Sequence, residues 1–292
     1  MNHQSSRSLS RSWNTHQHQL QSHDHIITQQ HQPQSHITID PLKLVLGQVI
    51  DRGTLSVVYK GWYQGQTVAV KVFDFGDNEV TKASMESMKI VFKREVDVWK
   101  NLDHPNVTKM IGATMSMTMN SENKNIKSKT ESDFCIVSEY VERGSLRSYL
   151  LKNHNKKLPM KTVFQFALDI AKGLSYLHSK KLIHFDVKPD NILIDSQYNL
   201  KLVDFGGSVF KPLGGLFLLC GEIGTRGYMA PEILSRKLCG HKCDVYSFGI
   251  CLWEIYNCDI AYPYDAGNNT IDVYKKRPRI PMDCPRPLAR LM

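Results

Sequence analysis

Two residues of opposite charge, Lys71 and Glu95, stand in apolar surroundings where a charge needs a partner. Lys71 belongs to a strand-like run over residues 67–73, in which the period of two sets Ala69 and Lys71 on one face and valines on the other. Glu95 lies within the apolar stripe of a helix expected over residues 88–102. Because a carboxylate directed at a core is costly without a cation, we expect an ion pair between them. In the alternative interpretation, Glu95 flanks the stripe and reaches water.

A second set of polar residues falls between residues 184 and 232. It contains His184-Phe185-Asp186-Val187-Lys188-Pro189-Asp190-Asn191, then Asp204-Phe205-Gly206, then Ala230-Pro231-Glu232. Taken alone, each short motif is weak evidence, because such combinations often arise by chance. Their order and spacing, behind a strand with a lysine and a helix with a glutamate, are highly specific.

Strands are expected first along the chain, and they position Lys71. Apolar runs typical of strands cover residues 42–46, 57–59 and 67–73, with a tight polar loop at residues 51–56. Gln64-Gly65 predicts a hairpin turn between the last two runs. A polar surface loop at residues 120–132 then precedes a further strand at residues 134–138.

Helices are expected in the second part of the chain. Ser145 is a candidate cap for a short helix that begins at Leu146. Residues 163–177 show an amphipathic helical pattern, and residues 245–256 are apolar almost all round, which is typical of a helix buried inside a lobe. Strands followed by helices predict an α+β protein with a small sheet lobe and a larger helical lobe, joined near residues 138–141.

Residues 1–40 differ in composition from the rest of the chain. They are rich in Gln, His and Ser and almost empty of periodic apolar residues, so we expect a disordered tail, with order beginning near Asp40-Pro41. The histidines of this tail could bind transition metals weakly, but a solvated tail is the preferred interpretation.

Composition excludes several classes of protein. The chain has 292 residues, of which 41% are hydrophobic, and a formal net charge of +9, as in a soluble globular protein able to bury a core. No apolar run approaches the roughly 20 residues of a membrane span, and the N-terminus lacks the apolar core of a secretory signal. We therefore expect a cytoplasmic protein without a membrane span.

The cysteines and the basic residues add little functional information. The seven cysteines are an odd number without zinc-knuckle spacing, which favours a reducing compartment. Cys239 and Cys243 could meet on one helical face, but we disfavour metal binding by an isolated pair. Much of the basic excess lies at residues 275–290, where prolines interrupt it and aromatic residues are not interleaved, so no nucleic-acid partner is expected.

The ordered motifs, together with Val68-Ala69-Val70-Lys71 and Glu95, resemble a eukaryotic protein kinase domain from about Leu42 to the end of the chain. The resemblance implies a bilobal kinase-like fold. Its N-lobe would cover residues 41–138, its hinge residues 139–141 and its C-lobe residues 142–292. Residues 39–44, 65–71 and 139–146 look like plant Raf-like mitogen-activated protein kinase kinase kinases, although the tyrosine-kinase-like group shares several of these features.

The resemblance also implies roles for the charged residues, since phosphoryl transfer depends mainly on positioning and on charge stabilisation. Asp186 would accept or orient the proton of the substrate hydroxyl, and Lys188 would neutralise the transferring phosphate. Lys71 would hold the α- and β-phosphates of ATP, oriented by Glu95. The hard oxygens of Asn191 and Asp204 would bind Mg²⁺.

An adenine site is implied between the lobes. Its expected residues are Ile50, Val58 and Ala69 above the base, Leu193 below it, backbone groups of Glu139 and Val141, and Gly53 in the loop over the phosphates. For each apolar residue the alternative is plain core packing, and for Leu193 the sequence does not separate the two.

The function expected from these residues is a Mg²⁺- and ATP-dependent serine/threonine protein kinase. By the resemblance, Lys188 and residues 224–232 point to serine/threonine substrates, and the implied partner is a protein substrate such as a downstream kinase in a mitogen-activated protein kinase cascade. The alternative is a kinase-like scaffold of weak or no activity. A nucleic-acid binder is the third hypothesis, and the sequence does not indicate an oligomeric state.

Departures from the family pattern motivate the scaffold alternative. The glycine-rich loop corresponds to Asp51, Gly53, Ser56 and Val58, so only its middle glycine is retained and weaker ATP binding is expected. Phe185 replaces the usual Arg, so ordering of the activation segment by a phosphate is not expected.

The activation segment and the end of the chain carry two further expectations. The segment holds the apolar residues Leu213, Leu216, Phe217, Leu218 and Leu219. We prefer their packing on the same lobe over docking to a partner. Relatives continue beyond the stretch at residues 277–281, so we also expect a truncated C-lobe, Glu232 without its usual cation, and less cover for the buried helix.

Overall fold

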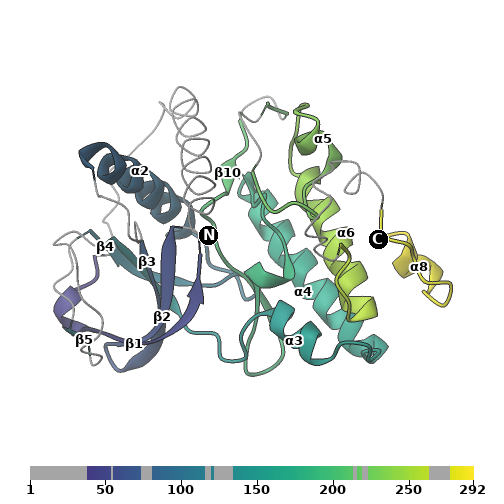
Figure 1. Cartoon of the computed structure of the whole chain (residues 1–292), viewed down its shortest axis with the longest axis horizontal. Helices are drawn as coiled ribbons and strands as arrows, with labels where there is room; N and C mark the ends of the chain where they lie inside the picture. Colours follow the sequence, from purple (N-terminus) through teal and green to yellow (C-terminus); the bar gives the residue numbers. More distant parts are fainter. Residues whose placement is uncertain are drawn as a thin grey trace, which may run out of the picture.

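The computed structural model describes residues 38–53, 55–73, 81–115, 120–121, 134–212, 216–218, 223–262 and 277–292. The predicted disordered tail therefore lies, up to residue 37, outside the described residues. The described residues form a sheet lobe and a helical lobe side by side (Figure 1). This arrangement confirms the predicted bilobal α+β fold.

Antiparallel strands build the sheet of the N-terminal lobe. They are β1 (Leu44–Arg52), β2 (Ser56–Tyr63), β3 (Gln66–Phe73), β4 (Met110–Thr114) and β6 (Cys135–Glu139). The short β5 (Asn120–Ser121) adds to the edge in parallel with β1, which gives the strand order β4-β6-β3-β2-β1-β5. Helix α2 (Lys82–Trp99) lies along the sheet (Figure 1).

Strand β3 has the two faces that its sequence predicts. Val68 and Val70 are fully buried in a core with Leu44 and Leu46, whereas Lys71 points away from that core. The hairpin between β2 and β3 turns at Gln64-Gly65, where both residues adopt positive φ angles of 46° and 85°. This turn fixes the register that places Lys71 opposite Val58.

Strand boundaries differ from the prediction at three places. Pro41–Lys43 is a short 3-10 turn, because the carboxylate of Asp40 caps it by accepting from the backbone N of Leu42 at 3.1 Å. The loop predicted at residues 51–56 is shorter, because β1 continues through Asp51, which pairs with Val58. Asn120 and Ser121 pair with β1 instead of lying in a surface loop, and residues 122–133 lie outside the described residues.

The C-terminal lobe is mainly helical. Its elements are α3 (Leu146–Lys152), α4 (Met160–Ser179), β7 (Leu182–Ile183), β8 (Ile192–Ile194), β9 (Leu200–Leu202), β10 (Val209–Phe210), α5 (Pro231–Leu234), α6 (Lys242–Asn257) and α8 (Arg286–Ala289). The hydroxyl of Ser145 caps α3 by accepting from the backbone N of Ser148 at 3.2 Å, as predicted. Helix α6 is the buried helix of the prediction and packs against α4.

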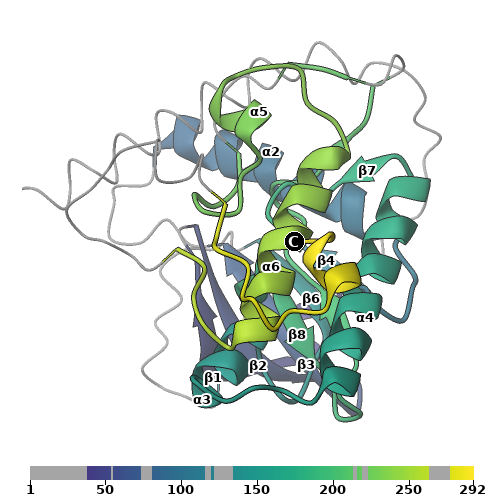
Figure 2. The same cartoon turned by 90° about the vertical axis from the view of Figure 1, so that its right-hand side faces the viewer.

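The last residues of the chain lie against α6 (Figure 2). A Cβ atom at Gly249 would stand 3.1 Å from the carbonyl oxygen of Leu291, so the two backbones approach closely there. Leu288 and Met292 are buried. The end of the chain thus supplies part of the cover for α6 that we expected to be missing. Within the described residues, no helix is both long and apolar enough to cross a membrane.

Candidate active site

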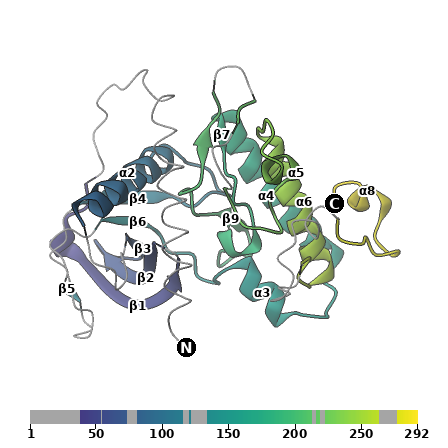
Figure 3. The same ribbon diagram turned by 45° about the horizontal axis from the view of Figure 1, so that its top comes forward.

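Pairs of short strands hold the two polar loops next to one another. Residues 184–191 connect β7 to β8, and residues 203–208 connect β9 to β10. Strand β7 pairs with β10, and β8 pairs with β9, which gives two small two-stranded sheets. Each loop begins in one of these sheets and ends in the other, so the two loops lie close together. Figure 3 shows β7 and β9 on the side of the helical lobe that faces the sheet lobe.

The buried carboxylate of Asp244, in the first turn of α6, fixes the first of these loops. It accepts from the backbone N of His184 at 2.9 Å and from that of Phe185 at 2.8 Å. The side chain of His178 lies 2.8 Å from the same carboxylate. These bonds hold Phe185 at a φ of 66°, a left-handed conformation that is unfavourable for a bulky residue. The loop is therefore held in one conformation by the core of the lobe.

Lys71 joins two carboxylates across the lobes. Its Nζ lies 2.7 Å from Glu95 Oε1 and 2.8 Å from Asp204 Oδ1. Glu95 is only 1% exposed, which confirms the predicted ion pair and excludes the interpretation in which Glu95 reaches water.

Burial and neighbouring charges shift the pKa values of this triad in opposite directions. Burial opposes the charge of Lys71, but Asp204 and Glu95 outweigh it and raise the pKa of the lysine. Burial raises the pKa of Glu95, although Lys71 works against that shift. Lys71 lowers the pKa of Asp204 to about 2. Lys71 and Asp204 are therefore both charged at neutral pH.

The ring of Phe205 orients the neighbouring Asp204. It is buried between Trp99 of α2 and His184, with a centroid distance of 5.4 Å to each ring. This packing joins α2 to both polar loops through apolar contacts. Asp204, at a left-handed φ of 67°, thereby keeps its carboxylate toward Lys71 with 44% of the side chain exposed.

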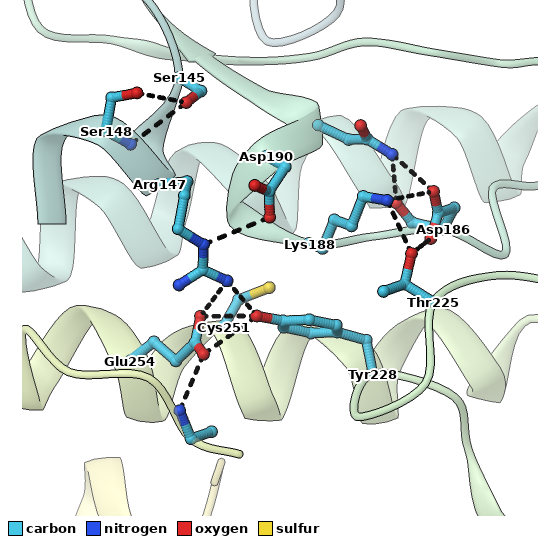
Figure 4. Close-up of polar contacts among 12 residues, drawn as sticks. Ser145, Arg147, Ser148, Asp186, Lys188, Asp190, Thr225, Tyr228, Cys251 and Glu254 are labelled. Carbon is cyan, nitrogen blue, oxygen red and sulfur yellow. Dashed lines mark hydrogen bonds and ion pairs between the residues drawn. The ribbon is translucent and has the colours of Figure 1, made fainter. Parts of the chain in front are cut away.

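Asp186, Lys188 and Thr225 form a compact polar group (Figure 4). Lys188 Nζ lies 3.0 Å from Asp186 Oδ2 and donates to Thr225 Oγ1 at 2.7 Å. The hydroxyl of Thr225 donates in turn to Asp186 Oδ1 at 2.7 Å. A hydroxyl thus donates to this carboxylate and accepts from this ammonium at the same time.

Asn191 and Asp204 fit a hard divalent cation. The side-chain Nδ2 of Asn191 donates to the backbone O and to Oδ2 of Asp186, at 2.9 and 2.8 Å, which leaves the amide oxygen as the group for a ligand. No cluster of three or more His, Cys, Asp or Glu suited to a metal occurs among the described residues. Mg²⁺ needs only one or two protein oxygens when phosphates supply others, so this donor set is sufficient.

Several residues expected around adenine lie on strands of the sheet lobe and in the segment that follows β6. Ala69 of β3 pairs with Ser138 of β6, and Val68 pairs with Glu139. The carboxylate of Glu139 forms an ion pair with Lys201 at 2.9 Å, so its side chain is already engaged and only its backbone suits a base. Ile50 is 41% exposed and Val141 is buried.

Three more residues expected at the nucleotide site lie on β2, β8 and the loop after β1. Val58 of β2 pairs with Lys71, and Leu193 of β8 forms a bridge to Ser145. The backbone N of Gly53 donates to the backbone O of Ser56 at 2.8 Å, which closes a tight turn between β1 and β2.

Phe185 lies in an apolar cluster that includes Phe217 of the activation segment. Its ring meets that of Phe217 edge to face, with centroids 6.1 Å apart, and Phe217 exchanges backbone hydrogen bonds of 3.1 and 2.9 Å with Cys239. Packing on the same lobe is thus confirmed for Phe217. Leu216 and Leu218 on either side are 62% and 58% exposed, and Leu213 and Leu219 lie outside the described residues.

Glu232 is a partly exposed residue of α5. Its Oε1 accepts from the thiol of Cys243 at 3.5 Å, and within the described ranges it forms no ion pair. The large cost expected for a buried carboxylate without its cation therefore does not apply to this partly exposed residue. The six described cysteines are free thiols.

Sequence reasoning assigned no role to several residues that support the site. Asp244 and Glu254 are fully buried charges on α6, and Arg147 of α3 binds Glu254. Charge inside an apolar helical pattern is the signal that found Glu95, and it would have found both carboxylates. Thr225 lies within residues 224–232, which we used only to infer the class of substrate.

Comparison with known proteins agrees with this geometry. Residues 44–286 match the family model described as "Protein kinase domain". The chain is 34% identical over 264 residues to the serine/threonine/tyrosine-protein kinase HT1 of Arabidopsis thaliana, an alignment that covers 87% of this chain and 62% of HT1.

Two further relatives come from the same plant. The chain is 35% identical over 255 residues to the serine/threonine-protein kinase STY46, covering 85% of this chain and 40% of STY46. It is 30% identical over 257 residues to the serine/threonine-protein kinase STY17, covering 87% and 41%. The chain thus spans less than two thirds of the length of each of these relatives.

Proposed function

This chain belongs to the protein kinase domain family, and we propose that it transfers the γ-phosphate of ATP to serine or threonine hydroxyls of a protein substrate. The observation that carries the proposal is the joint presence of the Lys71–Glu95–Asp204 triad and the Asp186–Lys188 pair at the junction of the lobes. Serine/threonine kinases among the relatives support the substrate class.

In the proposed reaction, the hydroxyl oxygen of the substrate bonds to the γ-phosphorus while the bond from that phosphorus to the bridging oxygen breaks, so ADP leaves. Asp186 orients the hydroxyl and takes its proton, and Lys188 stabilises the charge on the moving phosphate. Lys71 binds the α- and β-phosphates. Mg²⁺, held by Asn191 and Asp204, would supply positive charge to the phosphate oxygens.

Several finer assignments are part of this proposal. Ile50, Gly53, Val58, Ala69 and Leu193, with the backbone of Glu139 and Val141, would bind the nucleotide. We propose a Raf-like kinase that acts on a downstream kinase of a mitogen-activated protein kinase cascade, on the basis of the motifs at residues 65–71 and 139–146. The cytoplasmic location expected from the sequence stays a prediction.

A kinase-like scaffold is the second candidate function. Asp51 and Ser56 in the loop over the phosphates and the apolar Phe185 favour it, because they weaken nucleotide contacts and remove a cation. Thermal stabilisation by Mg-ATP without phosphate transfer to any substrate would support the scaffold.

The test compares the full chain with its Asp186→Asn variant in a radiolabelled Mg-ATP transfer assay on a generic protein substrate. We expect the rate to fall about 10²- to 10⁴-fold, because the carboxylate that takes the proton is removed. Asp103→Asn is the matched control, since Asp103 is an exposed residue outside the site with 83% of its side chain accessible. Equal rates for the wild type and Asp186→Asn would contradict the proposal.

A further inference from the structure

Arg147 forms ion pairs with two carboxylates beside the candidate active site (Figure 4). Its Nε lies 3.3 Å from Asp190 Oδ2, and its Nη2 lies 3.1 Å from Glu254 Oε2. Nη2 also donates to the hydroxyl of Tyr228, which in turn donates to Glu254 at 3.0 Å. The guanidinium of α3 therefore joins the catalytic loop, the end of the activation segment and α6.

This cluster borders the place that a protein substrate must reach. Asp190 shares its loop with Asp186, and the backbone N of Tyr228 donates to the backbone O of Thr225 at 3.0 Å. Thr225 itself contacts Asp186. An extended peptide advances about 3.3 Å per residue, so residues a few positions from the acceptor hydroxyl pass over this cluster.

The two carboxylates differ in how far a substrate can reach them. Glu254 is fully buried, whereas 49% of the Asp190 side chain is exposed. An exposed carboxylate next to an acceptor site attracts lysine and arginine side chains. Here the chain's own Arg147, which stays charged at every physiological pH, already fills that position with 15% of its side chain exposed.

We propose that Arg147 is a specificity-determining residue that masks Asp190 from basic residues of the substrate. The site then takes protein substrates whose residues next to the acceptor are uncharged or acidic and gains nothing from basic ones. This inference rests on the proposed kinase function, because it concerns the substrate of the same site. Removal of Arg147 together with its buried partner would unmask Asp190 and create a preference for basic peptides.

A purely structural role for Arg147 predicts a different result. If Arg147 only ties α3 to α6, its loss lowers stability and weakens all peptides alike, with no change in the ratio between a basic and a neutral peptide. The ratio of two affinities in one variant is therefore the informative measurement, because a general loosening of the site cancels in it.

The experiment measures peptide binding by fluorescence anisotropy on the full chain, with alanine in place of the acceptor so that no transfer occurs. One peptide carries arginine a few positions from that alanine on both sides, and its match carries glutamine at the same positions. We expect a ratio of affinities near one for the wild type and about three- to fivefold in favour of arginine for Arg147→Met/Glu254→Gln, the size of an exposed ion pair. Adding Asp190→Asn should return the ratio to one.

Two outcomes would overturn the proposal. One is an unchanged ratio in the double variant. The other is an arginine preference already present in the wild type and lost in Asp190→Asn alone, a variant of a half-exposed residue that should fold. Phosphate transfer to the matching serine peptides is measured separately. A wild type that transfers no phosphate would contradict the kinase function. The affinity ratios test the masking of Asp190 independently of phosphate transfer.

Discussion

Two cations in this molecule have the same arrangement and different tasks. Lys71 joins the buried Glu95 of α2 to the half-exposed Asp204, and Arg147 joins the buried Glu254 of α6 to the half-exposed Asp190. In both cases a helix supplies the buried carboxylate and a loop supplies the exposed one. The first cation faces the proposed nucleotide and the second faces the proposed peptide.

The difference lies in how freely each cation can change partners. The ammonium of Lys71 is a compact charge on a flexible chain, so it can turn from Asp204 to a phosphate while it keeps Glu95. The guanidinium of Arg147 is a planar fork that binds Asp190, Glu254 and Tyr228 together. The nucleotide side is therefore suited to exchange of partners, and the peptide side is held fixed.

The largest effect should come from breaking the first arrangement. Lys71→Met should lower kcat/KM for phosphate transfer about 10²- to 10³-fold, because a positioned charge on the phosphates is lost. Steady-state kinetics with Mg-ATP and a protein substrate measure this loss. Adding Glu95→Gln should leave the activity low, since the double variant still lacks the positive charge of Lys71, and recovery of activity in that double variant would contradict the assigned role.

The second arrangement should matter first for stability. Arg147→Met should lower the free energy of unfolding by about 3 kcal/mol, because it leaves the buried Glu254 without its cation. Urea unfolding followed by tryptophan fluorescence measures the change. Arg147→Met/Glu254→Gln is the matched control and should recover more than half of the loss. An equal loss in both variants would show that packing of the arginine stem, not charge, is responsible.

The smallest effect concerns the stability of the fold at low pH. Lys71 holds the pKa of Asp204 at about 2, below its ordinary value, so the pair stabilises the fold above about pH 4 and loses that contribution as the pH falls toward 2. Because Asp204 is 44% exposed, solvent screening limits the contribution to about 1 kcal/mol or less. Unfolding free energies between pH 5 and pH 2 should therefore fall slightly more steeply in the wild type than in Asp204→Asn. Parallel curves would argue against this charge pair as a source of stability.

Patterns in the sequence were sufficient for the fold and for the centre of the site. The alternation in β3 placed Lys71, and the misplaced charge in the stripe of α2 paired it with Glu95. The same reasoning on α6 would have found Asp244 and Glu254. The apolar pattern of this helix was used only to predict that the helix is buried. Asp244 accepts from the distant backbone of His184, and the distant partners of Glu254 are Tyr228 and Arg147.

Other features depend on contacts that no local pattern contains. Arg147 stands on a short capped helix where a polar residue normally faces solvent, and its partners come from three other parts of the chain. Asn120 and Ser121 are polar residues that become a strand only because the edge of β1 is free to pair. From the sequence, Phe185 indicated only that the usual Arg is absent. Its packing on Phe217 could not be predicted, because Phe217 comes from a distant part of the chain.

The cluster around Phe185 and Phe217 supplies an apolar contact between the activation segment and its lobe. The cluster holds Phe217 by burial of apolar surface, a force that weakens on cooling, alongside the backbone hydrogen bonds between Phe217 and Cys239. Added salt should leave Phe217 in place, because its described contacts are a ring contact and backbone hydrogen bonds. Cooling is therefore expected to weaken the contact between Phe185 and Phe217.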